Sequence, residues 1–330
     1  MLTEISEYTV FSQYSNKHFK VSINSVDCET VEKRFAIGCT DNGYCFVYDT
    51  FHSICKICCR TKHSIVLTDA KWEKNSMLKF CSTSLDGNLR LYDVTEHDNP
   101  FQTFNTGSHL HSCSFNFKSP IIACGMDGGS ARLFDLRQNV NLQALETSYE
   151  SDVKVVEWSP DSEYLVVCGD TDGHLMLFDT RQIREPYEFC WWRLQIDDES
   201  DSTAHDSSIV GLTFSPNGRR ILTLDNEKYL RQWGTDTGLA TAFEYKMNKV
   251  NKKNRRIGIC MTDKNEILIP ENNSIINITK KEKMVGHIQN VTAVTANAHG
   301  FVSTDQNGFL CVWRKRDEIQ IENDASDWSD

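Results

Sequence analysis

The sequence lacks a long apolar run, a basic N-terminal region and an excess of positive charge. No segment approaches the roughly 20 apolar residues that a membrane span needs, so no membrane partner is expected. The first residues, MLTEISEYTVFSQYS, do not resemble a signal peptide. Lys and Arg number 35 against 46 Asp and Glu, giving a net charge of −11. This balance argues against a nucleic-acid-binding surface, and we expect no direct nucleic-acid contact.

Signatures of catalysis are missing as well. The sequence has no Ser-His-Asp order, no phosphate-binding glycine loop, no HExxH and no paired carboxylates in a catalytic context. We therefore expect a protein that is not an enzyme and that uses no cofactor.

The 13 cysteines are an odd number spread through hydrophobic segments. Without a secretion signal, free thiols in a reducing compartment are favoured over a disulfide framework. Cys55, Cys58 and Cys59 lie near His52 and His63, which suggests a zinc site as one interpretation. Zinc wants four ligands, and no second cysteine pair stands at the usual spacing. We favour an outer strand here and predict no metal site.

The sequence does contain an internal repeat, and its period is close to the roughly 40–45 residues that form one propeller blade. Six closing aromatic residues mark the units: Tyr48, Tyr92, Phe134, Phe178, Trp233 and Trp313. Successive aromatics are 44, 42, 44, 55 and 80 residues apart. Five residues before each aromatic stands a glycine, except in the unit with Lys228, and ten before stands a small residue. This arrangement predicts a strand, a tight hairpin that tolerates positive φ, and a second strand.

The 80-residue gap has room for one more unit, whose closing strand we expect at residues 274–279. The 55-residue gap carries an insertion near residues 184–203. Together the units make seven blades over residues 20–316. Residues 1–19 form an N-terminal segment, in which residues 8–11 could complete the last blade and so remove an exposed sheet edge. Residues 317–330 read as an acidic, solvated tail.

These units resemble the WD40-repeat family. The likeness rests on Ala204-His205 and Gly286-His287, on strands that end in Ser-Pro, and on aspartates that follow four of the aromatics. It implies an all-β, seven-bladed WD40 β-propeller that works by holding other proteins. It also implies a structural hydrogen-bonded chain within a blade, carried by His205, Thr223, Trp233, His287 and Trp313. The turn position of the unit with His205 holds Glu227 instead of aspartate, so we expect that chain to be imperfect.

Two consecutive units share a further motif, Phe134-Asp135-Leu136-Arg137 and Phe178-Asp179-Thr180-Arg181. No other unit combines an aspartate directly after its aromatic with an arginine two residues later. A guanidinium makes planar, multidentate contacts, so we expect a docking surface at the narrow face of the propeller. The alternative is a local Asp–Arg pair that only staples the loop.

This tandem motif resembles the box of propellers that dock onto damaged-DNA-binding protein 1, the adaptor of cullin-4 ubiquitin ligases. The C-terminal half is also similar to the Cockayne syndrome group A family, through Ser202–His205, Val210–Leu212, Leu230–Trp233, Gly286-His287 and Asp327–Asp330. Phenylalanine replaces tryptophan in both boxes, and residues 1–19 have a poor helical pattern where that family carries a helical anchor.

The resemblance implies a non-catalytic substrate receptor of a cullin-4 ligase, acting in the nucleus in transcription-coupled nucleotide excision repair. Its partners would be damaged-DNA-binding protein 1, cullin-4, a Cockayne syndrome group B-like ATPase and RNA polymerase II. The adaptor contacts would be Asp135, Arg137, Asp179 and Arg181. The alternative is a WD40 scaffold for another nuclear complex, because fold does not fix function. A hydrolase with a metal in the channel is disfavoured, because small residues occupy the repeat's inner-strand position.

Three tryptophans are further candidates for partner contact: Trp191 and Trp192 in the insertion, and Trp328 in the tail. The basic cluster KVNKKNRR at residues 249–256 is either a nuclear localisation signal or phosphate contact, or a solvated loop between blades five and six. The solvated loop is the favoured interpretation.

Overall fold

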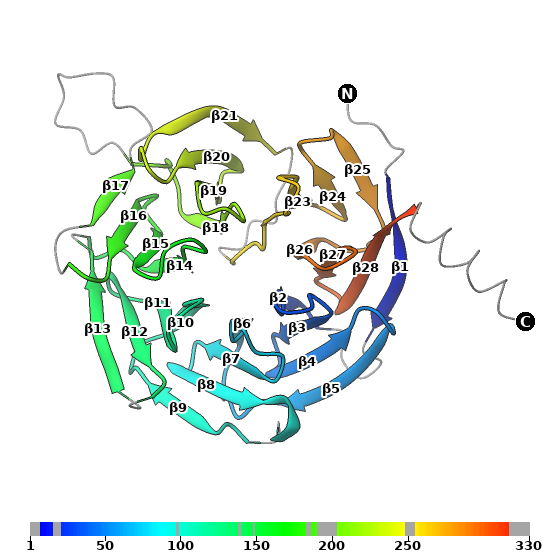
Figure 1. Ribbon diagram of the computed structural model, residues 1–330, viewed down its shortest axis with the longest axis horizontal. Helices are drawn as coiled ribbons and strands as arrows, with labels where there is room; N and C mark the ends of the chain where they lie inside the picture. The colour runs from blue at the N-terminus through cyan, green and yellow to red at the C-terminus, as the bar shows by residue number, and fades with distance from the viewer. Residues whose placement is uncertain are drawn as a thin grey trace, which may run out of the picture.

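The computed structural model describes residues 7–15, 21–96, 99–137, 140–147, 149–182, 186–189, 203–247 and 255–316. Within these ranges seven four-stranded antiparallel sheets surround a central channel (Figure 1). The expectation of an all-β, seven-bladed propeller is confirmed. The one helical element described is a short 3-10 turn, η1 (Val94–Glu96).

Six blades follow the chain order. Blade 1 consists of β2 (Ile23–Cys28), β3 (Phe35–Thr40), β4 (Tyr44–Asp49) and β5 (Ile54–Arg60). Blade 2 consists of β6 (Leu67–Trp72), β7 (Lys79–Ser84), β8 (Asn88–Asp93) and β9 (Gln102–Asn105). Blade 3 consists of β10 (Leu110–Phe115), β11 (Ile121–Met126), β12 (Ser130–Asp135) and β13 (Val140–Glu146). Blade 4 consists of β14 (Val153–Trp158), β15 (Leu165–Asp170), β16 (Leu175–Asp179) and β17 (Tyr187–Phe189). Blade 5 consists of β18 (Ile209–Phe214), β19 (Arg220–Asp225), β20 (Tyr229–Gly234) and β21 (Ala240–Lys246). Blade 6 consists of β22 (Cys260–Met261), β23 (Ile267–Glu271), β24 (Ser274–Asn277) and β25 (Glu282–Val285).

Blade 7 joins the two ends of the ring. It consists of β26 (Val291–Ala296), β27 (Gly300–Asp305), β28 (Phe309–Lys315) and, on its outside, β1 (Tyr8–Ser15). The β1–β28 register runs from Tyr8 opposite Lys315 to Ser15 opposite Phe309. Tyr8 is buried against Phe301, with ring centroids 5.1 Å apart. The first described strand thus holds the last blade and covers the edge of β28.

The hydrophobic core lies between the blades. One cluster, for example, joins Leu89 and Phe104 of blade 2 to Leu110, Phe115 and Phe134 of blade 3. The closing aromatics of the repeat are all buried in such layers. Burying one large apolar side chain stabilises a fold by about 1.5–3 kcal/mol, so each blade depends on its neighbours for much of its stability.

Blade 6 is the least regular blade. Its inner strand β22 has two residues, and no aromatic closes the unit. Strand β24 lies within the range where the 80-residue gap places a closing strand. Isoleucines from β23 and β24 fill the core here in place of the aromatic residue.

Candidate protein-interaction site at the channel mouth

A β-bulge recurs in the inner strands of six blades. In each, the register shifts after the first residue and skips the second. A bulge re-aims a side chain out of the regular alternation of a strand. The skipped residues, here called the mouth ring, are Asn24, Thr68, His111, Lys154, Val210 and Thr292.

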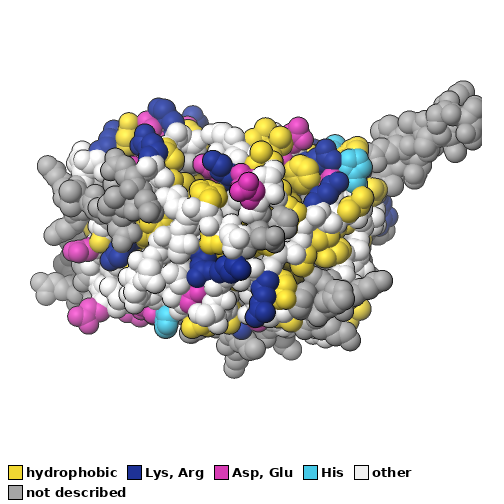
Figure 2. All heavy atoms as spheres, turned by 90° about the horizontal axis from the view of Figure 1, so that it is seen from below, with side chains coloured by type: hydrophobic (Ala, Val, Ile, Leu, Met, Phe, Trp, Pro, Cys, Tyr) yellow, Lys and Arg dark blue, Asp and Glu magenta, His cyan; other side chains and the backbone are white. Residues whose placement is uncertain are grey.

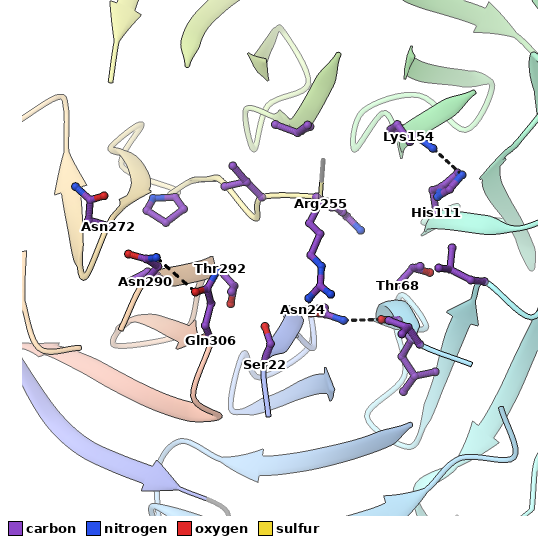
Figure 3. Close-up of a pocket in the computed structure, with 18 residues that line it drawn as sticks. Ser22, Asn24, Thr68, His111, Lys154, Arg255, Asn272, Asn290, Thr292 and Gln306 are labelled. Carbon is purple, nitrogen blue, oxygen red and sulfur yellow. Dashed lines mark hydrogen bonds between the residues drawn. The ribbon is translucent and has the colours of Figure 1, made fainter. Parts of the chain in front are cut away.

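All six members of the mouth ring line one cavity of about 260 Å³ at the end of the channel where the inner strands begin (Figure 3). Ser22, Asn272, Asn290 and Gln306 add further polar groups to its wall. Sequence reasoning missed this ring, although its members stand 21–24 residues before the closing aromatics. The residue type at this position differs between neighbouring blades.

Three members of the mouth ring also link neighbouring blades. Asn24 donates to the carbonyl of Leu67 at 2.7 Å, and Thr68 donates to that of Leu110 at 2.9 Å. The Thr292 hydroxyl donates to the carbonyl of Ile23 at 2.5 Å, across the junction between blades 7 and 1. These bonds hold the ring in place, so the cavity is built before any partner arrives.

Two arginines of the basic cluster enter the channel. Arg255 pairs with Asp41 at 2.8 Å, and Arg256 pairs with the buried carboxylate of Asp69. The interpretation of the cluster as a solvated loop is wrong for Arg256, which neutralises a buried carboxylate of blade 2, whereas Arg255 is exposed and pairs with blade 1 at the surface of the cavity. Burial lowers the pKa of Arg256 to about 10, which leaves it charged at neutral pH. Residues 249–254 lie outside the described part of the chain.

More ionisable groups line the channel below the mouth, where Asp27, Lys71, Glu157 and Arg256 share a second cavity. Lys71 bonds Asp27 at 3.1 Å. Burial alone would raise the pKa of Asp27, but Lys71, Lys74 and the Trp72 N–H outweigh it and lower that pKa. Burial raises the pKa of Glu157 to about 7, although Lys71 opposes the shift.

A hydrogen-bonded chain runs through blade 5. The Trp233 indole donates to the Thr223 hydroxyl at 2.8 Å, and that hydroxyl lies 2.7 Å from His205 Nε2. His205 Nδ1 lies 3.1 Å from Asp225. The expectation of an imperfect chain is therefore wrong. The aspartate stands two residues before Glu227, at the end of β19, where it also accepts a hydrogen bond from the backbone of Tyr229.

Blade 7 repeats the chain in the same order. The Trp313 indole donates to Ser303 at 2.8 Å, Ser303 lies 2.6 Å from His287 Nε2, and His287 Nδ1 lies 3.1 Å from Asp305. His287, Ser303 and Asp305 are all buried. The geometry agrees with a structural role and leaves no open face for a substrate.

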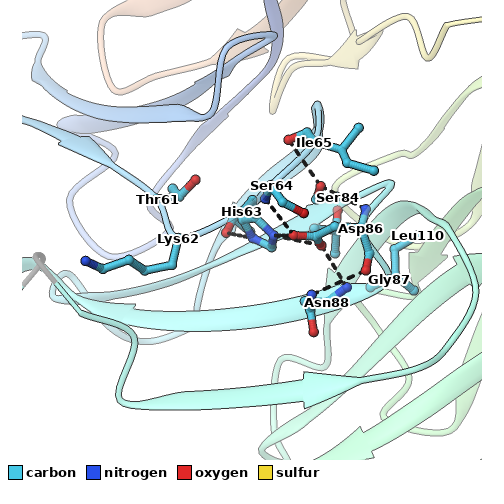
Figure 4. A network of polar contacts seen from close by, with 12 residues as sticks. Thr61, Lys62, His63, Ser64, Ile65, Ser84, Asp86, Gly87, Asn88 and Leu110 are labelled. Atoms are coloured by element: carbon cyan, nitrogen blue, oxygen red, sulfur yellow. Dashed lines mark hydrogen bonds and ion pairs between the residues drawn. The ribbon is translucent and has the colours of Figure 1, made fainter.

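Blade 2 has a partial version that sequence reasoning did not recognise (Figure 4). His63 bonds Ser82 at 2.8 Å through one ring nitrogen and Asp86 at 3.0 Å through the other. The signal for it was the Asp-Gly turn of this unit combined with a histidine 23 residues before the aspartate.

The hypothetical zinc site does not form from the residues considered for it. His63 is engaged in blade 2, and His52 bonds Asp49 at 2.9 Å. Along β5, Cys58 is exposed and Cys59 is buried, so the two thiols point to opposite faces. Among the described residues, the one group with metal-ligating geometry is His111, Asp127 and Asp152.

The two arginine boxes lie at the end of the blades opposite the mouth. In blade 4 the first residue of β15, Leu165, pairs with Asp179 of the box. The last residue of β15, Asp170, pairs with Val153, which begins the inner strand at the mouth. Arg181 forms a two-pronged pair with Asp179, at 3.0 and 2.6 Å, and lowers the pKa of that carboxyl. Its guanidinium also lies 4.5 Å from the centre of the Tyr164 ring.

Arg137 is held more loosely. Its side chain makes one contact with Asp135, at 3.5 Å, and is 67% exposed, against 57% for Arg181. In both boxes the carboxylate also accepts the backbone N–H of the arginine and so fixes the turn. The two aspartates therefore fix the conformation of their turns, while both guanidinium groups remain partly exposed to solvent. Whether these groups contact a partner stays a prediction.

Trp191, Trp192 and Trp328 lie outside the described residues. On the side formed by blades 1 and 2, Lys and Arg side chains are interspersed with Asp and Glu (Figure 2). In the described part of the chain, no helix has the length and apolar character to cross a membrane.

Comparisons with known proteins agree with the repeat. The family model "WD domain, G-beta repeat" matches residues 141–179 and 199–234. Periodic tryptophan protein 1 homolog of Drosophila melanogaster is 27% identical over 56% of this chain and 39% of that protein. Ribosome biogenesis protein YTM1 of Pyricularia oryzae is 29% identical over 37% of this chain and 26% of that protein. Radiation-sensitive protein 28 of Saccharomyces cerevisiae is 26% identical over 38% of this chain and 26% of that protein.

The chain thus spans about two fifths of the length of the first of these relatives and about a quarter of the other two. With seven four-stranded blades, the chain is a seven-bladed β-propeller, and residues 141–179 and 199–234 of it match the WD40 repeat.

Proposed function

We propose that the protein is a non-catalytic WD40 scaffold of a nuclear protein complex and that it holds a partner segment at the channel mouth. The mouth ring carries the proposal, because six blades each contribute a bulged side chain, of five residue types in all, to one pre-formed cavity. Pre-organised groups lose little entropy on binding, which favours recognition of a single partner. The name of the relative from Pyricularia oryzae favours ribosome biogenesis as the process.

The mouth places two ion-paired cations next to neutral amides: Lys154 lies 3.1 Å from Asp152, and Arg255 lies 2.8 Å from Asp41. Lys154 and Arg255 stand among Asn24, Asn272 and Asn290 in the cavity wall. A guanidinium and an ammonium with neighbouring amides suit a partner segment that combines a carboxylate with backbone carbonyl groups. We therefore expect an acidic residue of the partner to exchange with Asp41 or Asp152 at these cations.

The ligase receptor is the second candidate function. It is favoured by the two exposed guanidinium groups on adjacent blades and by a relative named for radiation sensitivity. In this interpretation Arg137 and Arg181 contact damaged-DNA-binding protein 1, and Asp135 and Asp179 support them by fixing the two turns. Cullin-4 is bound through that adaptor, and the group B-like ATPase and RNA polymerase II are the clients.

One experiment separates the two functions. The tagged wild type, Arg255→Ala/Lys154→Ala and Arg137→Ala/Arg181→Ala are each purified from cells, and the bound proteins are quantified by mass spectrometry. The variants alter opposite faces, so each is the control for the other. The scaffold proposal expects the mouth variant to lose its main partners and the box variant to keep them. Recovery of cullin-4 and its adaptor with the wild type, lost in the box variant, would establish the ligase function instead. Unchanged recovery of all partners in the mouth variant would refute docking at the mouth.

A further inference from the structure

One polar cluster at the mouth consists of a histidine and two aspartates. His111 comes from the bulge of β10, Asp127 from the turn after β11, and Asp152 from the residue before β14. A ring nitrogen and two carboxylate oxygens of these residues all lie within 4.8 Å of one another. They join blade 3 to blade 4, and His111 opens onto the mouth cavity.

The ammonium group of Lys154 occupies the position that a metal cation would take in this cluster. Its ammonium lies 3.1 Å from Asp152, 3.9 Å from Asp127 and 2.9 Å from His111 Nε2. His111 Nε2 also lies 2.5 Å from Asp127 Oδ1. One ring nitrogen cannot serve both neighbours, because it donates to a carboxylate only with its proton and accepts from an ammonium only without it. The cluster therefore holds one contact between two donors or two acceptors, whichever state the ring adopts.

We propose that His111, Asp127 and Asp152 bind a divalent transition-metal ion that clamps blade 3 to blade 4 at the channel mouth. A metal accepts electron pairs from Nε2 and from both carboxylates, which removes the conflict at the ring nitrogen. Two carboxylates balance the charge of a divalent ion once Lys154 turns away, and Lys154 already borders the open cavity. An imidazole with two carboxylates suits zinc or manganese better than magnesium, which prefers oxygen ligands alone.

Neighbouring groups orient the ligands as outer-shell partners do in metal sites. His109 bonds the second oxygen of Asp127 at 2.8 Å, and the Gly128 N–H donates to Asp152 at 3.1 Å. Such bonds fix the direction in which a ligand's free lone pair points. His111 and Lys154 are 14% and 19% exposed, so the site is sheltered yet open to ions through the cavity.

The test uses the full chain, treated with a chelator and then titrated with zinc chloride by calorimetry, with magnesium chloride as the selectivity control. The wild type should bind one zinc ion. His111→Ala should weaken binding by about 100-fold or more, since loss of an outer-shell partner alone costs about 10–100-fold. His52→Ala is the matched control, because His52 lies beside the exposed thiol segment of β5 and outside the cluster.

Lys154→Met is a second test, and its result does not depend on whether His111→Ala folds correctly. Removing the competing ammonium should strengthen zinc binding by about tenfold or more, because a like charge a few ångströms from the ion is removed. At a zinc concentration about 100 times Kd, the unfolding equilibrium constant should fall by about 100-fold. Equal binding by the wild type and a folded His111→Ala would mean adventitious binding at thiols. Equal affinity of wild type and Lys154→Met, or no binding by either, would also overturn the proposal.

Discussion

The hydroxyl of Thr223 is the centre of the hydrogen-bonded chain in blade 5, so replacing Thr223 with valine tests what that chain contributes. Valine keeps the shape of the side chain and removes the oxygen that bonds Trp233 and His205. Both partners are fully buried, and water cannot readily replace the lost bonds. Leaving one buried polar group unsatisfied costs about 1–3 kcal/mol. With two such groups, Thr223→Val should lower the free energy of unfolding by about 2–6 kcal/mol.

Thr223→Ser is the matched control. It keeps the hydroxyl and removes one methyl group, which costs about 1 kcal/mol. Blade 7 uses Ser303 at this position in the same chain, so serine is chemically compatible with it. Urea unfolding followed by circular dichroism gives both free energies, provided that the slopes of the two curves agree with the wild type.

The double variant Thr223→Val/Trp233→Phe isolates the bond between the two residues. If the indole and the hydroxyl depend on each other, the summed losses of unfolding free energy in the two single variants should exceed the loss in the double variant by about 1 kcal/mol or more. A valine variant that is no less stable than the serine variant would refute the view that the hydroxyl, and not packing, supports this blade.

Three further outcomes are expected. Burial lowers the pKa of His63 and of His205, so the unfolded chain takes up protons first, and stability should fall as the pH drops below about 6.5, levelling off below the folded-state pKa. His174, whose pKa is raised, contributes with the opposite sign, and urea midpoints between pH 7.5 and 5 give the net result. Gly173→Ala should destabilise by at least about 2 kcal/mol in the same assay, since its φ is +91° and a Cβ would lie 2.1 Å from the carbonyl oxygen of His205. Deleting residues 1–15 should expose the edge of β28 and produce aggregates in size-exclusion chromatography, whereas a soluble, fully folded monomer would contradict the closing role of β1.

The repeat was readable from the sequence because its signals are local. An aromatic residue, a turn that needs positive φ and a small residue recur within a dozen positions, and these features specify one hairpin each. Gly43, Gly87, Gly129, Gly173 and Gly308 indeed have positive φ, and so does Lys228 in the unit without the glycine. The mouth ring was not readable in this way, because a bulge depends on the pairing of two strands and has no residue signature of its own.

The site was harder to predict because its contacts join distant parts of the chain. Arg256 finds Asp69 across 187 positions, and the link appears only when the ring is closed. Asp225 was missed although it lies near its partner His205 in the sequence. Its position relative to the turn differs from that of Asp86 in blade 2 by two residues. A fixed offset therefore fails wherever the hairpins differ in how they place the carboxylate.

The same arginine segment explains how a ring with one degenerate blade stays closed. The backbone N–H of Ile257 donates to Val210 of blade 5, and that of Gly258 donates to Thr292 of blade 7. A Cβ at Gly258 would lie 2.5 Å from that of Ala293, so only glycine allows this approach. Residues 255–258 thus bridge the blades on either side of the two-residue strand β22, while the arginines pair with blades 1 and 2 across the channel. Because the bridge lies in the wall of the mouth cavity, a partner that binds there contacts the segment on which ring closure depends. Binding at the mouth and the stability of blade 6 should therefore be coupled, and each should strengthen the other.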